Sequence, residues 1–329
     1  MKTIIYTCPY VPAEWITAHG LRPSRIIPMA AGPDSPLSRA EGVCPFVQGF
    51  INEVIISKKA QGAVITTVCD QMRRAYDILL LRSDVPLFLM NVPNTWQNVS
   101  VQKLYIDELK RLGRFLQKQG GKSPSDDNLA KIMLEYDTVR TSVLEIGGYL
   151  SSRQYAESIA DFNRDGPGQK LIDSTTSQLS AKVVPLAVFG GPLMKQNFEL
   201  FDIVEQAGGR IVLDATETGE RGLCAPFDRR GLHDNPLLEL ASAYFCGIQD
   251  ASRRPNSGLY KWFKSRLADR EVRGIIFYRH LWCDIWHAEL QRLKDWTDLP
   301  VLDIDTAGDN KTTSQRTINR IRAFLETLQ

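Results

Sequence analysis

The sequence predicts an α/β protein built from two parallel β-sheets, each covered by helices on both faces. The first observation is its length, because 329 residues correspond to two domains at about 150 residues per domain. The second is an alternation of short apolar runs with segments of helical periodicity, which is typical of parallel sheets. The third is a weak internal repeat: in both halves a buried strand, a Cys-Asp pair, a helix, an Asp-x-Pro sequence and a second strand follow one another.

The first half alternates strands and helices up to about residue 90 and is helical afterwards. Runs rich in β-branched and apolar residues predict strands, and apolar positions three or four apart predict helices. In order, we expect strands at 3–7 and 25–29, a helix at 43–57, a strand at 63–67, a helix at 70–81, a strand at 85–91, and a helical stretch over 97–162 with a loop near 120–127.

The second half resumes the alternation after a polar, Gly/Ser/Thr-rich segment at 163–178, which predicts a linker. We therefore expect an N-terminal α/β domain with a helical extension over 1–165 and a C-terminal α/β domain over 180–329. In order, its expected elements are strand 183–189, helix 193–207, strand 210–213, helices 236–245 and 258–267, strand 274–278, helix 284–296, strand 300–304 and helix 313–328.

The composition excludes several classes of function. Lys plus Arg number 40 and Asp plus Glu 38, so a net charge of +2 gives no basis for binding nucleic acid or an anionic membrane. No stretch approaches the roughly 18 to 20 apolar residues of a membrane span. The first residues do not resemble a signal peptide, because the apolar run ends at Thr7-Cys8-Pro9. We expect a cytoplasmic protein with reduced thiols.

Three of the six cysteines occupy equivalent places. Cys44, Cys69 and Cys283 each precede a predicted helix, which for Cys44 starts near Phe46, and the last two lie at the carboxyl end of a strand. Ligands of doubly wound sheets bind at the carboxyl ends of strands, and a helix N-terminus stabilises a thiolate. Two such domains facing each other would bring Cys69 and Cys283 to one cleft. We interpret the three as ligands rather than as buried apolar side chains.

Two other interpretations of the cysteines compete with an iron–sulfur site. Zinc sites usually contain closely spaced cysteine pairs, and the sequence offers only Cys283-x₃-His287, where we expect His287 to pack or face solvent. A nucleophilic cysteine needs a nearby base, and the four histidines show no local signature. Widely spaced thiolates without histidine favour an iron–sulfur cluster.

We interpret three further sequence patterns as ordinary structural features rather than as binding sites. Gly190-Gly191 predicts a tight strand-to-helix turn, with close approach of a ligand as the alternative. Arg73-Arg74 predicts a solvated helix face. Arg253-Arg254 predicts a loop before a helix, with contact to a phosphate or a partner as the alternative.

Four segments carry a family resemblance, and they occur in the family's order. They are TCPYVPAE at 7–14, VCPF at 43–46, TTVCD at 66–70, and a closing segment with CD at 283–284 and LPVL at 299–302. The chain thereby resembles the 2-hydroxyacyl-CoA dehydratase and benzoyl-CoA reductase family, of the 2-hydroxyglutaryl-CoA dehydratase D-component type.

The resemblance implies two flavodoxin- or Rossmann-like domains with a helical segment between them. It implies a [4Fe–4S] cluster held by Cys44, Cys69 and Cys283, which leaves one iron open. The implied enzyme is an oxygen-sensitive, anaerobic lyase or oxidoreductase that uses low-potential electrons for radical dehydration or reduction of an acyl-CoA. The implied partners are an ATP-dependent iron–sulfur activator protein and either a homologous subunit or a second copy of this chain.

The resemblance leaves two alternatives open. Some relatives hold a double-cubane [8Fe–9S] cluster on six cysteines and reduce small molecules. Cys8 and Cys246 fit that pattern, whereas its middle position is Glu217, and Cys224 lies seven residues later as a substitute. A non-catalytic, cluster-binding paralogue in a larger complex is the other alternative.

Glu14 is the candidate catalytic residue, because it matches a glutamate of the opening motif and would act as an acid or base near the cluster. The alternative is a glutamate in the first turn of a helix, stabilised by the macrodipole.

Overall fold

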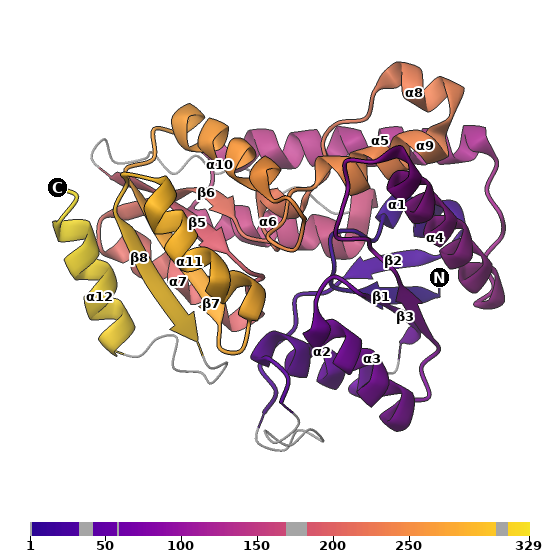
Figure 1. Ribbon diagram of the computed structural model, residues 1–329, viewed down its shortest axis with the longest axis horizontal. Coiled ribbons are helices and arrows are strands. Elements are labelled where there is room, and N and C mark those ends of the chain that lie inside the picture. Colours follow the sequence, from indigo (N-terminus) through magenta and orange to yellow (C-terminus); the bar gives the residue numbers. More distant parts are fainter. Residues whose placement is uncertain (1, 33–41, 58, 169–182, 307–314) are drawn as a thin grey trace.

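The computed structural model describes residues 2–32, 42–57, 59–168, 183–306 and 315–329. It contains two four-stranded sheets whose paired strands are all parallel, so the predicted fold class is confirmed (Figure 1). The strands of the first sheet are β1 (Thr3–Tyr6), β2 (Arg22–Arg25), β3 (Ala60–Thr66) and β4 (Leu87–Met90). Those of the second are β5 (Val184–Gly190), β6 (Gly209–Ala215), β7 (Gly274–His280) and β8 (Val301–Thr306).

The two sheets have the same topology. Their strand orders are β2-β1-β3-β4 and β6-β5-β7-β8, which correspond to the first four strands of the flavodoxin-like order. In this order the second strand lies on one side of the first strand, and the third and fourth strands lie on the other side. The place between the first and third strands is called the switch point, and ligands bind there, outside the carboxyl ends of the strands. The switch points of this protein therefore lie between β1 and β3 and between β5 and β7.

Alternation of buried side chains assigns the helices to the faces of the first sheet. Ile5 and Ile65 pack with one pair of helices, whereas Ile4 and Val64 point to the opposite face. The first pair is α2 (Pro45–Ile56) and α3 (Asp70–Arg82); the opposite face is covered by α1 (Ala13–Ala18) and α4 (Val99–Lys118).

The second sheet is covered in the same way. Phe189 and Phe277 pack against α10 (Ser257–Asp269) and α11 (Asp284–Trp296). On the opposite face, strand residues pack with α7 (Glu199–Gln206) and α12 (Gln315–Glu326). None of the described helices is both long and apolar enough to cross a membrane.

Long helices connect the two sheets, and one segment of the second half packs on the first. The connectors are α5 (Asp126–Glu145) and α6 (Ser152–Asp165). After β6 the chain forms α8 (Arg229–Asp234), α9 (Pro236–Ala241) and a π-helix (Ser242–Gly247), whose apolar residues join the core of the N-terminal half. Figure 1 shows α8 and α9 beside α5. Each sheet lies within one of the two predicted ranges, and the domain boundaries stay a prediction.

A few elements differ from those expected. The second strand is Arg22–Arg25 rather than 25–29, because an edge strand accepts Pro23 without losing a ladder hydrogen bond. The six-residue helix α8 was not expected, since it is too short to show a helical period, and a helix at α1 was expected only as the alternative for Glu14. The predicted linker at 163–178 lies largely outside the described residues.

Candidate functional site

Three cysteines each directly precede a helix, and their thiols line one cavity. Cys44, Cys69 and Cys283 are the N-cap residues of α2, α3 and α11, as the sequence predicted. All three line a cavity of about 270 Å³ between the carboxyl ends of the two sheets. The residues that contact this space come from both halves, so neither sheet alone encloses it.

The strand topology explains why these residues meet. Cys69 lies shortly after β3 and Cys283 shortly after β7, so each stands at the switch point of its sheet. Cys8 follows β1 on the other side of the first switch point, and it lines the same cavity. The main-chain N–H of Cys44 donates to the side-chain oxygen of Gln71 at 2.7 Å, which ties the start of α2 to the first turn of α3.

Each of the three thiols is close to main-chain N–H groups in the first turn of the helix that follows it, and these groups lower the thiol pKa. They belong to Phe46 and Val47 for Cys44, to Gln71 and Met72 for Cys69, and to Trp286 for Cys283. N–H donors of this kind stabilise negative charge on sulfur, as at any helix N-terminus.

Burial nevertheless keeps these thiols protonated. It raises the pKa of Cys69 to about 12 and that of Cys283 to about 11, and it raises the pKa of Cys44 further. Cys69 and Cys283 further raise the pKa of Cys44, and Cys283 raises that of Cys69, because negative charges on neighbouring sulfurs repel. A cationic metal centre would remove the penalty and release the protons.

Two acids, the partly buried Glu217 and the buried Asp250, share the cavity with the thiols. Burial and the nearby charge of Asp250 raise the pKa of Glu217 to about 7, against the opposing effect of Arg25 and Arg221. Asp250 is itself paired with Arg221. The sequence did not indicate that Asp250 would line the cavity. Glu217 was noted only as a departure from a cysteine pattern, although its place just after β6 marks the same edge of a sheet.

His280 also lines the cavity and was not anticipated. Its Nε2–H donates to the Pro192 carbonyl at 2.9 Å, whereas Nδ1 is buried without a partner among the described residues. Burial lowers the pKa of His280 to about 4, so the ring is neutral at physiological pH. The sequence signal was its position at the carboxyl end of β7.

The positions of the arginines and glycines refine the sequence interpretation. Arg73 and Arg254 line the cavity, whereas Arg253 is buried and donates to main-chain carbonyls.

Gly190 has a φ of +155°, and a Cβ there would collide with the carbonyl of Tyr278 on β7. The glycine therefore allows two strands to approach closely at the switch point.

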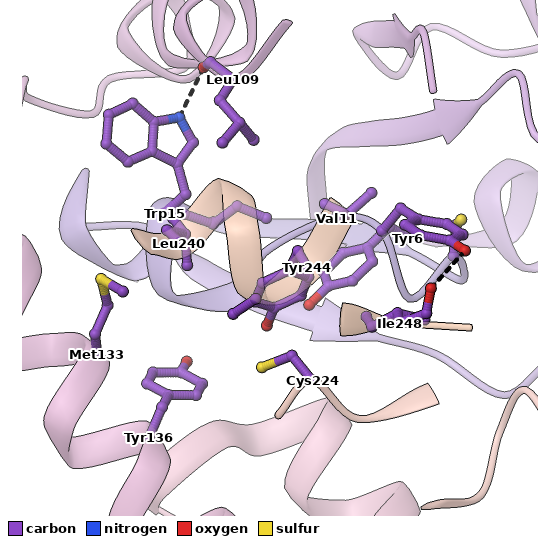
Figure 2. Close-up of a cluster of buried hydrophobic side chains, with 14 of the residues drawn as sticks. Tyr6, Val11, Trp15, Leu109, Met133, Tyr136, Cys224, Leu240, Tyr244 and Ile248 are labelled. Atoms are coloured by element: carbon purple, nitrogen blue, oxygen red, sulfur yellow. Dashed lines mark hydrogen bonds between the residues drawn. The ribbon is translucent and has the colours of Figure 1, made fainter. Parts of the chain in front are cut away.

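Cys224, Cys246 and Glu14 do not line the cavity. Cys224 accepts a hydrogen bond from Arg140 Nη1 at 2.7 Å and lies near the tyrosines of the core cluster drawn in Figure 2. Burial raises its pKa to about 12. Cys246 is half-buried in the π-helix, and burial raises its pKa.

Glu14 belongs to the same buried network as Cys224. Its carboxylate pairs with Arg140 at 3.2 Å and accepts the Tyr244 hydroxyl at 2.6 Å. Glu14 stands in the first turn of α1 and is fully buried. This location favours the structural alternative over a catalytic role at the cavity.

The donor set that the described part of the chain gives the cavity does not form a site for a single metal ion. Within the described residues no three His, Cys, Asp or Glu side chains converge closely enough to hold one metal ion. His287 is exposed and does not line the cavity with Cys283. In a cluster the thiolates bind different irons, so they surround the metal centre rather than converge on one point.

Comparisons with known proteins agree with the resemblance. Residues 8–328 match the family described as 2-hydroxyglutaryl-CoA dehydratase, D-component. The comparison with curated proteins gives no match. Among solved structures, the substrate-binding protein FpvC from Pseudomonas aeruginosa in complex with Mn²⁺ is 11% identical over 99% of each chain, with a TM-score of 0.26, which is too low to carry an argument.

Proposed function

The chain belongs to the 2-hydroxyglutaryl-CoA dehydratase D-component family, and on this premise we propose that it is the iron–sulfur subunit of such an enzyme. The observation that carries the proposal is the common cavity of Cys44, Cys69 and Cys283, each at the start of a helix. These three thiols would hold a [4Fe–4S] cluster. When bound, the cluster would supply low-potential electrons for dehydration or reduction of an acyl-CoA.

In this proposal the residues around the thiols also have functional roles. The nearby helix N–H groups would stabilise negative charge on the sulfurs and so tune the reduction potential. Packing of the two sheet edges limits access of water. Arg73 and Arg254 supply positive charge toward an anionic substrate.

The proposed partners follow from the family. They are a homologous subunit or a second copy of this chain, and an ATP-dependent iron–sulfur activator that delivers the electron. We place the protein in the cytoplasm, where its thiols stay reduced.

A double-cubane cluster is the second candidate, because Cys8 is a fourth thiol in the cavity. Cys224 and Cys246 lie outside it, so four thiols rather than six surround the space. This arrangement supports a single cubane more directly. A non-catalytic paralogue would hold the same cluster without binding an acyl-CoA.

Anaerobic reconstitution with iron and sulfide tests the proposal. The expected result is about four irons per chain with visible absorption, and about eight would favour the double cubane. Cys44→Ser, Cys69→Ser and Cys283→Ser should each lose most of the iron and colour. Cys246→Ser is the matched control and should retain both. Absence of iron in the wild type, or full retention in Cys69→Ser, would contradict the proposal.

A further inference from the structure

The loop after β6 holds the main chain of Glu217 in a fixed position. The Asp214 carboxylate accepts hydrogen bonds from the N–H of Thr216 at 3.0 Å and from its hydroxyl at 2.6 Å. The Glu217 carbonyl accepts a hydrogen bond from Arg25 Nη2 at 2.6 Å. The main chain is therefore anchored on both sides of the Glu217 side chain.

The Glu217 carboxylate itself has no hydrogen bond or ion pair within the described residues, although it lines the cavity. The two nearest arginines use their donors elsewhere. Arg25 donates to the carbonyls of Thr7, Gly222 and Glu217. Arg221 donates to the Asp250 carboxylate and to carbonyls of the main chain. Asp250, the buried acid of the cavity, is thus already paired.

Glu217 lines the same cavity as the four thiols Cys8, Cys44, Cys69 and Cys283. Its charge acts on Cys69 and Cys283 and is the strongest charged influence on Cys8. Glu217 therefore faces these thiols across the cavity from the loop after β6.

We propose that the Glu217 carboxylate is the oxygen ligand of the metal centre, on the position that three cysteine thiolates leave open. The inference rests on the proposed function, since it requires that the cluster binds. A carboxylate is a suitable ligand for iron and exchanges with other oxygen donors more readily than a thiolate does. Glu217 would thus occupy the open iron until a substrate oxygen replaces it.

This assignment has consequences for cluster stability and potential. An anionic ligand lowers the reduction potential of a cluster, because it disfavours the added electron. Removal of the charge should raise the potential, while three thiolates still retain the cluster. The fourth iron should then be lost more easily than the other three.

The experiment compares the reconstituted full-length wild type with Glu217→Gln, which keeps the shape of the side chain. Asp70→Asn is the matched control, because Asp70 lines the same cavity but its side chain is 90% exposed and next to a ligand. The readouts are iron per chain, the rate of iron loss to a chelator under mild oxidation, the electron paramagnetic resonance of a three-iron product, and the reduction potential.

The expected result for Glu217→Gln is a full initial complement of iron, severalfold faster loss of one iron, a three-iron signal and a raised potential. Asp70→Asn should lose iron at the wild-type rate. Glu217→Cys should slow the loss again, because a thiolate replaces the oxygen ligand, and this variant separates ligation from a folding defect.

Three outcomes would overturn the inference. If Glu217→Gln matches the wild type in iron loss and potential, Glu217 is not a ligand, although the proposed function stands. If Cys8→Ala rather than Glu217→Gln releases one iron, Cys8 holds the fourth position. If the wild type binds no iron at all, the proposed function fails together with the inference.

Discussion

Cys69 and Cys283 stand at equivalent positions of two different sheets and line one cavity. Each is the N-cap residue of the helix that follows the third strand of its sheet. The topology repeats, and the two carboxyl edges face each other across the cavity. A site of this kind requires both halves of the chain.

Chemical labelling of thiols should show that Cys69 and Cys283 belong to the same site. In the metal-free protein, alkylation of Cys69 and Cys283 should be slow at neutral pH and faster as pH rises, because only the thiolate reacts and burial raises both pKa values. After anaerobic reconstitution both should be protected. Cys246 lies outside the cavity and should be labelled equally in both states, as measured by peptide mass spectrometry. Equal labelling of Cys69 before and after reconstitution would contradict the assignment.

Arg140 should be important for stability. Arg140→Met leaves the fully buried Glu14 carboxylate without its cation, so we expect a loss of about 3 to 5 kcal/mol in the free energy of unfolding. Arg22→Ala breaks an ion pair with Asp165 at the surface and should cost no more than about 1 kcal/mol. Urea unfolding followed by circular dichroism compares the two. Similar small losses would show that the buried network is not a stabilising unit.

Gly222 should not tolerate a side chain. A Cβ at this position would collide with the Glu217 carbonyl and meet the Arg25 guanidinium at 2.9 and 3.0 Å. Gly222→Ala should therefore cost roughly 1 to 3 kcal/mol in the free energy of unfolding and lower the iron content after reconstitution. Gly148→Ala is the control, because a Cβ at Gly148 meets nothing within 4 Å. If both variants behave like the wild type, the loop is less constrained than its contacts indicate.

Histidine burial should make stability depend on pH. Burial lowers the pKa of His19 from 6.5, although its Nδ1–H donates to the Trp15 carbonyl at 2.7 Å. Below about pH 6.5 the unfolded chain binds a proton that the folded protein does not, so stability falls with pH until the folded pKa is reached. In His19→Asn, which retains an amide donor, the decrease between pH 7 and 5 should be smaller. Identical pH profiles from denaturant titrations would contradict this explanation.

Arg73 should contribute to acyl-CoA binding. It lines the cavity, and within the described part of the chain its ion pair with the exposed Asp70, at 3.6 Å, is weak. On the proposed function, we expect Arg73→Met to weaken the binding of a 2-hydroxyacyl-CoA about tenfold, which corresponds to ~1.4 kcal/mol. Arg74→Met removes the same charge one residue away, outside the cavity, and should change the Kd little. Calorimetry on the reconstituted protein measures both, and equal effects would show that only overall charge matters.

The sequence predicted most of the fold because the signals are local. The 13-residue helix Asp284–Trp296 has the predicted bounds, since its start follows from a Cys-Asp pair and its length from apolar spacing. The short helix Arg229–Asp234 was missed because six residues do not show a period. The second strand, Arg22–Arg25, begins earlier than the predicted 25–29, because an edge strand accepts the proline at position 23.

The sequence by itself determined the fold class, the family and the three cysteines that begin helices, because each depends on neighbouring residues. The tertiary structure decided which distant side chains meet. It brought Cys8 and Glu217 to the cavity and placed Glu14, Cys224 and Cys246 elsewhere. The physical reason is that strand order and sheet packing, rather than spacing along the chain, set the distances between the ends of parallel strands.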